Sequence, residues 1–128
     1  MTLLLDTHVI IWSVLAPSLI SARAFELLRD VRNVRLLSAV SCWEIATKLQ
    51  TGKLVLPFPL EEFLDRQTSD LILTPLPLTR AHATGVAALP PLHRDPGDRL
   101  LIAQAKAERV PIVTNDAWIR RYDVEVIW

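Results

Sequence analysis

Leu3-Leu4-Leu5-Asp6 is a run of three leucines that stops abruptly at a carboxylate. A short, unbroken apolar run of this kind is typical of a strand buried on both faces of a parallel sheet. A buried carboxylate without a partner is unfavourable, so Asp6 marks either a helix cap or a site that holds a cation. The rest of the chain bears on which of the two applies.

Short apolar runs alternate with helical patterns along the remaining sequence. Further strands are predicted at residues 34–37, 71–73, 110–114 and 124–127, helices at residues 22–32, 40–50, 60–69, 78–89 and 98–109, and a helical turn at residues 117–122. The proline-containing segment 54–59 is predicted to be a connector or an edge segment. This alternation predicts a three-layer α/β/α sandwich around a mostly parallel central sheet.

The composition is that of one compact domain, which we expect to span residues 1–128. A hydrophobic content of 51% with 22% charged residues argues against disorder. Fourteen basic and fourteen acidic residues give a net charge of zero, which argues against a partner held by bulk positive charge. With only three glycines there is no glycine-rich phosphate loop, which argues against a P-loop ATPase or a dinucleotide-binding dehydrogenase.

Cysteine content and the N-terminal segment indicate where the protein works. Cys42 is the single cysteine and cannot form an internal disulfide, which suits a reducing compartment. The apolar residues 3–15 are interrupted by Asp6 and His8 and are too few for a membrane span. We therefore expect a cytoplasmic protein that does not contact a membrane.

Four acidic residues are predicted to meet at one edge of the sheet. Asp6 and Asp116 each follow a predicted strand, Glu44 lies early in the helix after the second strand, and Asp98 opens the helix that leads into residues 110–114. The carboxyl ends of parallel strands and the first turns of the helices that follow them share one edge. Carboxylates gathered there repel one another unless a cation lies among them, and oxygen ligands suit Mg²⁺. The pattern favours an open divalent-metal site.

Each of these acids also has a purely structural explanation. Asp98 can interact with the helix macrodipole, with Asp95 as the N-cap and Pro96 in the first turn. Glu44 can form a capping box with Ser41 or pair with Lys48. Asp116 can cap the helical turn that follows it.

Other reactive residues are assigned to the structure. His8, His82 and His93 lack the spacing of a zinc site and are interpreted as packing or surface residues, with His8 also able to support Asp6 or contact substrate. Cys42 is interpreted as a small buried hydrophobe. The four tryptophans are interpreted as core or interface anchors: Trp12, Trp43, Trp118 and Trp128.

Four segments in this order resemble one known family. They are LLLDTHVIIW at residues 3–12, SAVSCWEIATKLQTGKL at residues 38–54, HRDPGDRLLIAQA at residues 93–105 and PIVTNDAWIRRYDVEVIW at residues 111–128. Together they resemble a PIN domain, and more specifically the VapC-type ribonuclease toxins of bacterial toxin–antitoxin pairs. Each motif alone is weak, whereas four in order over nearly the whole chain are specific.

The resemblance implies a set of site residues. Those that match the family's acidic positions, and so imply catalytic and metal-binding roles, are Asp6, Glu44, Asp98 and Asp116. Asp95, Thr114 and Asn115 match positions that would support them. Gly97 departs from the family's pattern, in which a bulky residue is expected, and should loosen the start of its helix.

The resemblance also implies an activity and partners. It implies an endoribonuclease that uses one or two Mg²⁺ or Mn²⁺ ions to activate water, leaving a 5′-phosphate and a 3′-hydroxyl. It further implies a homodimer that is silenced by a cognate antitoxin. Arg94 and Arg99 flank the Asp98 motif and Lys48 follows Glu44 by one turn, and whether these three contact RNA or are solvated surface charges stays open.

Three other classes of protein remain as alternatives. The first is a catalytically silent PIN-like module that serves protein contacts. The second is a phospho-acceptor receiver-like domain, which needs an aspartate after the third strand and a late lysine, whereas here that strand runs into Thr74-Pro75 and the last lysine, Lys106, lies in a helix. The third is a structure-specific DNA nuclease of related fold, for which the chain lacks the length.

Overall fold

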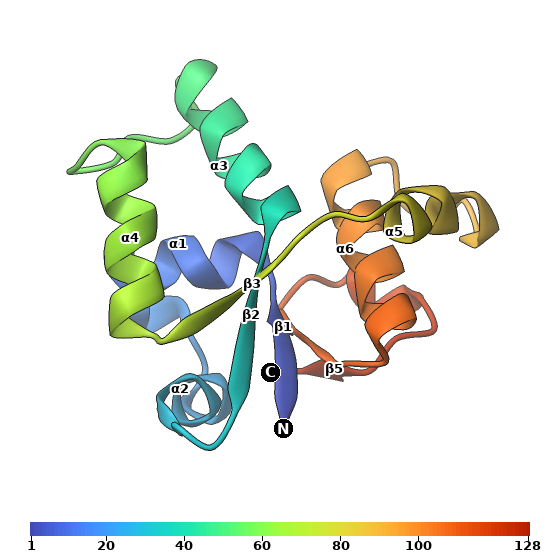
Figure 1. Cartoon of the computed structure of the whole chain (residues 1–128), viewed down its shortest axis with the longest axis horizontal. Coiled ribbons are helices and arrows are strands. Elements are labelled where there is room, and N and C mark those ends of the chain that lie inside the picture. Colours follow the sequence, from blue (N-terminus) through green and yellow to red (C-terminus); the bar gives the residue numbers. More distant parts are fainter.

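A five-stranded sheet is the central layer of the computed structural model, which describes residues 1–128 (Figure 1). The strands lie in the order β3-β2-β1-β4-β5, and every neighbouring pair is parallel. They are β1 (Thr2–Leu5), β2 (Val34–Ser38), β3 (Leu73–Leu76), β4 (Ile112–Val113) and β5 (Val126–Ile127). The predicted α/β sandwich is confirmed, with a sheet that is parallel throughout.

Helices cover both faces of this sheet. They are α1 (Thr7–Leu15), α2 (Ala22–Arg29), α3 (Ala39–Gln50), α4 (Leu60–Asp70), α5 (Arg80–Gly85) and α6 (Pro96–Glu108), with short 3₁₀ turns at Pro17–Leu19, Val86–Ala88 and Ile119–Arg121. In Figure 1, α1, α2 and α4 lie on one side of the strands and α5 and α6 on the other. None of the helices combines the length and the apolar character that a membrane span requires.

The leucine run of β1 supplies both halves of the core. Leu3 and Leu5 belong to a cluster that includes Ile10 of α1 and Phe63 of α4, while Leu4 belongs to a second cluster with residues of α6. Successive side chains of a strand point to opposite faces, so a strand covered on both faces is apolar at every position. Leu3, Leu4 and Leu5 are all fully buried, which explains why this run does not alternate with polar residues.

Several predicted boundaries are wrong. The third strand occupies Leu73–Leu76 instead of residues 71–73 and includes Pro75. It pairs only with β2 and is an edge strand, where a residue without a backbone N–H is tolerated. The helix predicted at residues 78–89 begins at Arg80, because Thr79 caps it, and gives way to the 3₁₀ turn at Val86–Ala88.

Candidate functional site

The strand order reverses at the centre of the sheet, where β1 lies between β2 and β4. In parallel α/β sheets such a reversal opens a crevice beyond the carboxyl ends of the strands, where ligands bind. Asp6 follows β1 directly, and Thr114 follows β4 directly. Glu44 in the second turn of α3 and Asp98 in the first turn of α6 complete the surroundings of Asp6.

Asp6 is buried at this edge of the sheet, with 3% of its surface exposed. Its Oδ2 accepts a hydrogen bond of 2.7 Å from the Thr114 hydroxyl and lies 3.9 Å from Nδ1 of His8. Its Oδ1 is buried and has no hydrogen-bond partner, and the side chain does not cap α1. Burial raises the pKa of Asp6, and the nearby charge of Asp116 raises it further, against the lowering effects of Thr114 and His8.

Glu44 points from α3 toward the starts of α1 and α6. Its Oε1 lies 3.0 Å from the hydroxyl of Thr7, which also lies 2.9 Å from that of Ser41. Burial raises the pKa of Glu44 to about 7, and the charges of Asp98, Asp95 and Asp6 add to the rise.

Both structural explanations considered for Glu44 are wrong. Ser38, not Ser41, is the N-cap of α3, and its hydroxyl accepts a hydrogen bond from the backbone of Val40. Lys48 makes no ion pair with Glu44.

Gly97 is the residue that lets Glu44 approach α6. A Cβ atom at Gly97 would lie 2.6 Å from Cδ and 2.7 Å from Oε1 of Glu44, closer than such atoms can come. The expectation that Gly97 merely loosens the helix is therefore incomplete, because its missing side chain makes the space that the carboxylate fills.

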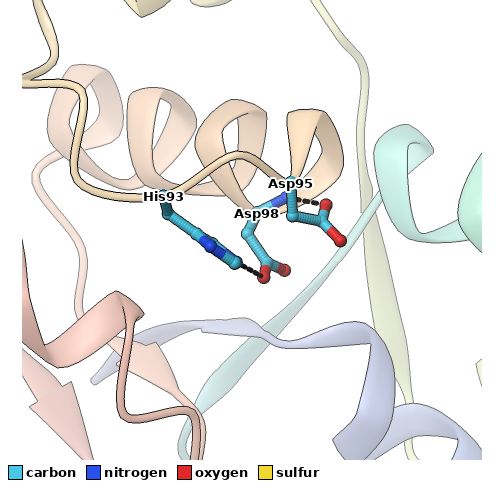
Figure 2. Close-up of side chains that lie close together, drawn as sticks. All are labelled: His93, Asp95 and Asp98. Atoms are coloured by element: carbon cyan, nitrogen blue, oxygen red, sulfur yellow. Dashed lines mark hydrogen bonds and ion pairs between the residues drawn. The ribbon is translucent and has the colours of Figure 1, made fainter.

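Asp98 lies in the first turn of α6 and is 8% exposed (Figure 2). Its backbone N–H donates to the N-cap Asp95 over 3.1 Å, which confirms the predicted cap, and its Oδ2 lies 2.8 Å from Nε2 of His93. Burial raises the pKa of Asp98 to about 6; the hydrogen bond from His93 opposes the rise, and the charges of Asp95, Asp6 and Asp116 add to it.

Sequence reasoning missed His93. Its interpretation as a packing or surface residue is incomplete: the ring does pack on Trp118, but it also contacts Asp98. With Asp95 and Asp98 it forms a group of possible metal ligands whose donor atoms lie within 4.8 Å of one another. The spacing of His93 and Asp98, which is not a helical one, reflects the turn of chain before α6. The proximity of a histidine to the DPGD helix start was the one available signal.

Asp116 both caps the turn after it and adds charge to the site. Its Oδ1 accepts hydrogen bonds from the backbone N–H groups of Trp118 and Ile119, at 2.7 and 3.2 Å, as expected of a cap. Its own N–H donates over 3.0 Å to the hydroxyl of Thr114, which therefore links Asp116 to Asp6. Asn115 is exposed and makes no side-chain hydrogen bond to any of the acids.

The three basic candidates have different surroundings. Lys48 lines a groove of about 190 Å³ together with Glu44, Asp95 and Gly97. Arg94 is exposed at the same end of α6. Arg99 instead donates to the carbonyls of Pro90 and Val86, at 2.9 and 3.3 Å, and to the hydroxyl of Tyr122, at 3.0 Å. The structure gives Arg99 an internal role, and we do not retain it among the RNA contacts.

These donors fit a hard divalent cation. The side chains that converge are carboxylates, which are the ligands that such cations prefer. Burial and mutual repulsion raise the pKa values of Asp6, Glu44 and Asp98. The buried Oδ1 of Asp6 lacks the cationic or donor partner that a buried carboxylate requires. The hydroxyls of Thr7 and Thr114 donate to Glu44 and Asp6 and hold these carboxylates in place. The arrangement is suited to binding a metal beside a phosphate.

Comparison with solved structures finds proteins of the same fold. The crystal structure of VapBC2 from Rickettsia felis, bound to a DNA fragment from its promoter, contains a chain that is 17% identical, with a TM-score of 0.74 over 99% of this chain and 98% of that one. FitAcB from Neisseria gonorrhoeae is 22% identical, with a TM-score of 0.64 over 98% and 96% of the two chains. FitAB bound to an IR36 DNA fragment is 21% identical, with a TM-score of 0.64 over 98% and 93%.

At these identities the structural likeness extends to the fold. No curated protein sequence matches the chain. The family model of the PIN domain, however, matches residues 3–125, which include every strand residue of β1 to β4 except Thr2 and all four acids of the site. On that match, the chain belongs to the PIN domain family.

Proposed function

We propose that this protein is a metal-dependent endoribonuclease and the toxin of a toxin–antitoxin pair. The observation that carries the proposal is the buried Oδ1 of Asp6, which has no partner and is surrounded by acids whose pKa values are raised. PIN domains are typically nucleases, and the structural neighbours include VapBC and FitAB assemblies. These findings support a nuclease, and the choice of RNA as substrate rests on the resemblance to VapC-type toxins.

We assign Mg²⁺ or Mn²⁺ to Asp6, Glu44, Asp98 and Asp116. Asp116 uses Oδ1 for capping, which leaves its Oδ2 for a ligand. A cation held there supplies positive charge beside the phosphate and a lowered pKa for water. The site takes one ion or two, and titration of the chain with Mn²⁺ counts them.

The protein's own residues orient these groups. Thr114 fixes one oxygen of Asp6, and the other oxygen, which is buried, has no protein partner. Thr7 fixes the carboxylate of Glu44 through the hydrogen bond from its hydroxyl. The expected products are a 5′-phosphate and a 3′-hydroxyl.

Substrate contacts are proposed for Lys48 and Arg94. Lys48 lines the groove beside Glu44, and Arg94 is exposed next to Asp95. If Arg94 contacts a phosphate, Arg94→Ala weakens RNA binding and reduces the slope of log affinity against log salt by about one. Arg23→Ala, at an exposed position on α2, is the matched control and leaves the slope unchanged.

An antitoxin and a second copy of the chain are the proposed partners. Large apolar side chains are exposed on several elements, among them Trp43 at 53%, Val31 at 74% and Val55 at 81%. Exposed apolar surface of this kind fits protein interfaces. We expect the antitoxin to present a basic side chain to the acids, and we place the complex in the cytoplasm.

Cleavage of RNA with mapping of the new ends tests the proposal. Purified protein is incubated with a pool of cellular RNA and Mg²⁺ or Mn²⁺, and 5′-phosphate ends are sequenced. Asp6→Asn is expected to abolish cleavage while the fold persists, and Asp65→Asn, at an exposed position of α4, is expected to cleave like the wild type. Cleavage by folded Asp6→Asn at the wild-type rate would refute the assignment, and absence of cleavage by the wild type would favour a silent PIN-like module.

A further inference from the structure

His93 occupies a position between Asp98 and an aromatic ring. Its Nε2 lies 2.8 Å from Oδ2 of Asp98, and its ring lies flat on that of Trp118, with centroids 5.4 Å apart and planes 2° from parallel. Its backbone N–H donates to the hydroxyl of Tyr122 over 2.8 Å. The imidazole is therefore held by its backbone, its face and its edge, as Figure 2 shows for the contact with Asp98.

We propose that His93 is a positioning residue: its imidazole holds the carboxylate of Asp98 in the orientation that a divalent cation requires, and Trp118 holds the imidazole. This inference rests on the proposed function, because it assigns a role to His93 toward the metal of the same site. It gives roles to His93 and Trp118, which are not among the site residues that the resemblance implies.

The contacts of Asp98 show why a positioning residue is needed. The cap residue Asp95 satisfies the backbone N–H of Asp98 but does not touch its carboxylate. The only hydrogen bond to that carboxylate comes from His93. Without it, nothing but packing would restrict rotation of the Asp98 side chain. With it, Oδ2 is fixed and Oδ1 remains for a cation.

The same geometry distinguishes positioning from direct ligation. An ionised carboxylate only accepts hydrogen bonds, so Nε2 of His93 carries the hydrogen and has no lone pair to offer a metal. Through this nitrogen, His93 acts on Asp98 and not on the cation itself. Residues that hydrogen-bond to a metal ligand in this way commonly contribute about 10–100-fold to metal affinity.

The Trp118 ring on which His93 stacks is itself held in place by a second neighbour. Trp118 is 45% exposed, so burial alone does not account for its place. The guanidinium carbon of Arg121 lies 4.8 Å from the centroid of the Trp118 ring, while His93 stacks on that ring as well. The cation of Arg121 and the ring of His93 both pack on the indole, and the stacked indole restricts the plane of the imidazole.

Mn²⁺ titration of the full chain, measured by calorimetry, tests the inference. His93→Ala is expected to weaken Mn²⁺ binding by about 10-fold or more, and His93→Gln, which keeps an N–H donor, to recover most of that loss. Trp118→Ala is expected to weaken binding about threefold, and Trp118→Phe, which keeps a flat ring for stacking, to bind like the wild type. His82→Gln, in a histidine–carboxylate pair at the other end of α6, is the matched control and leaves Mn²⁺ affinity unchanged.

Three results would overturn the inference. One is a His93→Ala variant that folds and binds Mn²⁺ as the wild type does. If that variant fails to fold, the corresponding result is a Trp118→Ala variant with wild-type affinity for Mn²⁺ and a His93→Gln variant that has lost Mn²⁺ binding. Another is a directly coordinated imidazole nitrogen in the pulsed electron paramagnetic resonance spectrum of the Mn²⁺ complex that disappears in His93→Ala. The third is a wild type that does not bind Mn²⁺, or an Asp6→Asn variant that binds it as tightly as the wild type does. Either outcome would refute the proposed metal site itself. Titrating the wild type and Asp6→Asn alone distinguishes this failure from the first two.

Discussion

Each end of α6 carries a carboxylate that lies 2.8 Å from Nε2 of a histidine outside the helix. Asp98 contacts His93 at the N-terminal end, and Glu108 contacts His82 of α5 at the C-terminal end. At the N-terminal end the carboxylate is buried and other acids surround it. At the C-terminal end the carboxylate is exposed and the histidine is the buried partner, 2% exposed. About 15 Å of helix separates the two acids, at 1.5 Å per residue.

The difference lies in how completely the polar groups are satisfied. Nδ1 of His82 accepts from the backbone N–H of Thr79 over 3.1 Å, and Gln104 connects that region to Ser38, the cap of α3. At the other end, Oδ1 of Asp6 has no partner and three acids repel one another. One end of α6 stabilises the fold, and the other end holds an electrostatic imbalance that a cation would relieve.

Replacing each carboxylate by its amide separates the two ends most strongly. Asp98→Asn is expected to lower kcat/KM for RNA cleavage on the order of 100-fold or more, because metal assistance contributes several kcal/mol and each 1.4 kcal/mol is tenfold. Glu108→Gln is expected to stay within about twofold, since it only replaces a charged acceptor for His82 by a neutral one, remote from the site. Equal losses in the two variants, measured at saturating Mn²⁺, would contradict the distinction.

Truncating Gln104 tests the structural end of the helix. Gln104 is fully buried, accepts a hydrogen bond from the hydroxyl of Ser38, and lies 3.4 Å from the carbonyl of Pro77. Gln104→Ala leaves buried polar groups unpaired and a cavity, so it should lower the free energy of unfolding by about 2–4 kcal/mol. Urea unfolding of the metal-free protein measures this, with exposed Lys106→Ala on the same helix as the control; a change no greater than that of the control would show that the network is dispensable.

The pH dependence of stability tests the acidic end. The pKa of Glu44 rises from 4.5 to about 7 on folding, and that of Asp98 from 3.8 to about 6. The folded state therefore binds more protons than the unfolded state between these values, and the metal-free protein loses stability as the pH rises through this window. After allowance for solvent screening, the loss between pH 5 and pH 8 should be on the order of 1–2 kcal/mol.

Unfolding in the presence of a chelator at both pH values measures that loss. Asp98→Asn should show a smaller difference, and saturating Mn²⁺ should abolish it. The lowered pKa of Asp30, about 2, does not interfere because that carboxyl titrates far below pH 5. A metal-free wild type that is more stable at pH 8 than at pH 5 would contradict the account.

Adding a methyl group at Gly97 produces the smallest expected change in stability. Gly97→Ala forces the carboxylate of Glu44 to move, because the new Cβ would lie 2.6 Å from its Cδ. Mn²⁺ affinity should fall severalfold, while stability changes by less than about 1 kcal/mol because alanine is favoured over glycine in a helix. Gly85→Ala is the control, since its Cβ would lie 3.7 Å from that of Ala103, an ordinary contact. Undiminished affinity in Gly97→Ala would show that Glu44 is not held at this position for the metal.

The parts of the structure that depend on local pattern could be predicted from the sequence. The leucine run predicted β1 because a strand covered on both faces has apolar residues at every position. The DPGD segment predicted the start of α6 because capping acts within one turn. The convergence of Asp6, Glu44 and Asp98 followed from the shared edge of strand ends and helix starts.

The contacts that depend on distant residues could not be predicted. Thr7 and Glu44 are 37 residues apart, and no pattern indicates that their side chains meet. In the sequence Arg99 is a candidate substrate contact, but its guanidinium donates to the carbonyls of Val86 and Pro90, which precede α6 by several residues. The predicted position of the third strand, residues 71–73, is wrong because a proline normally ends a strand, whereas β3 lies at the edge of the sheet and accommodates Pro75.

A crystal grown with Mn²⁺ and examined by anomalous scattering is the most direct test of the claim that the N-terminal end of α6 is a metal site. We predict an anomalous peak in contact with Oδ1 of Asp6 and the carboxylate of Asp98, and none at Glu108. A map at saturating Mn²⁺ with no peak beside Asp6, or with its peak at another part of the molecule, would contradict the account.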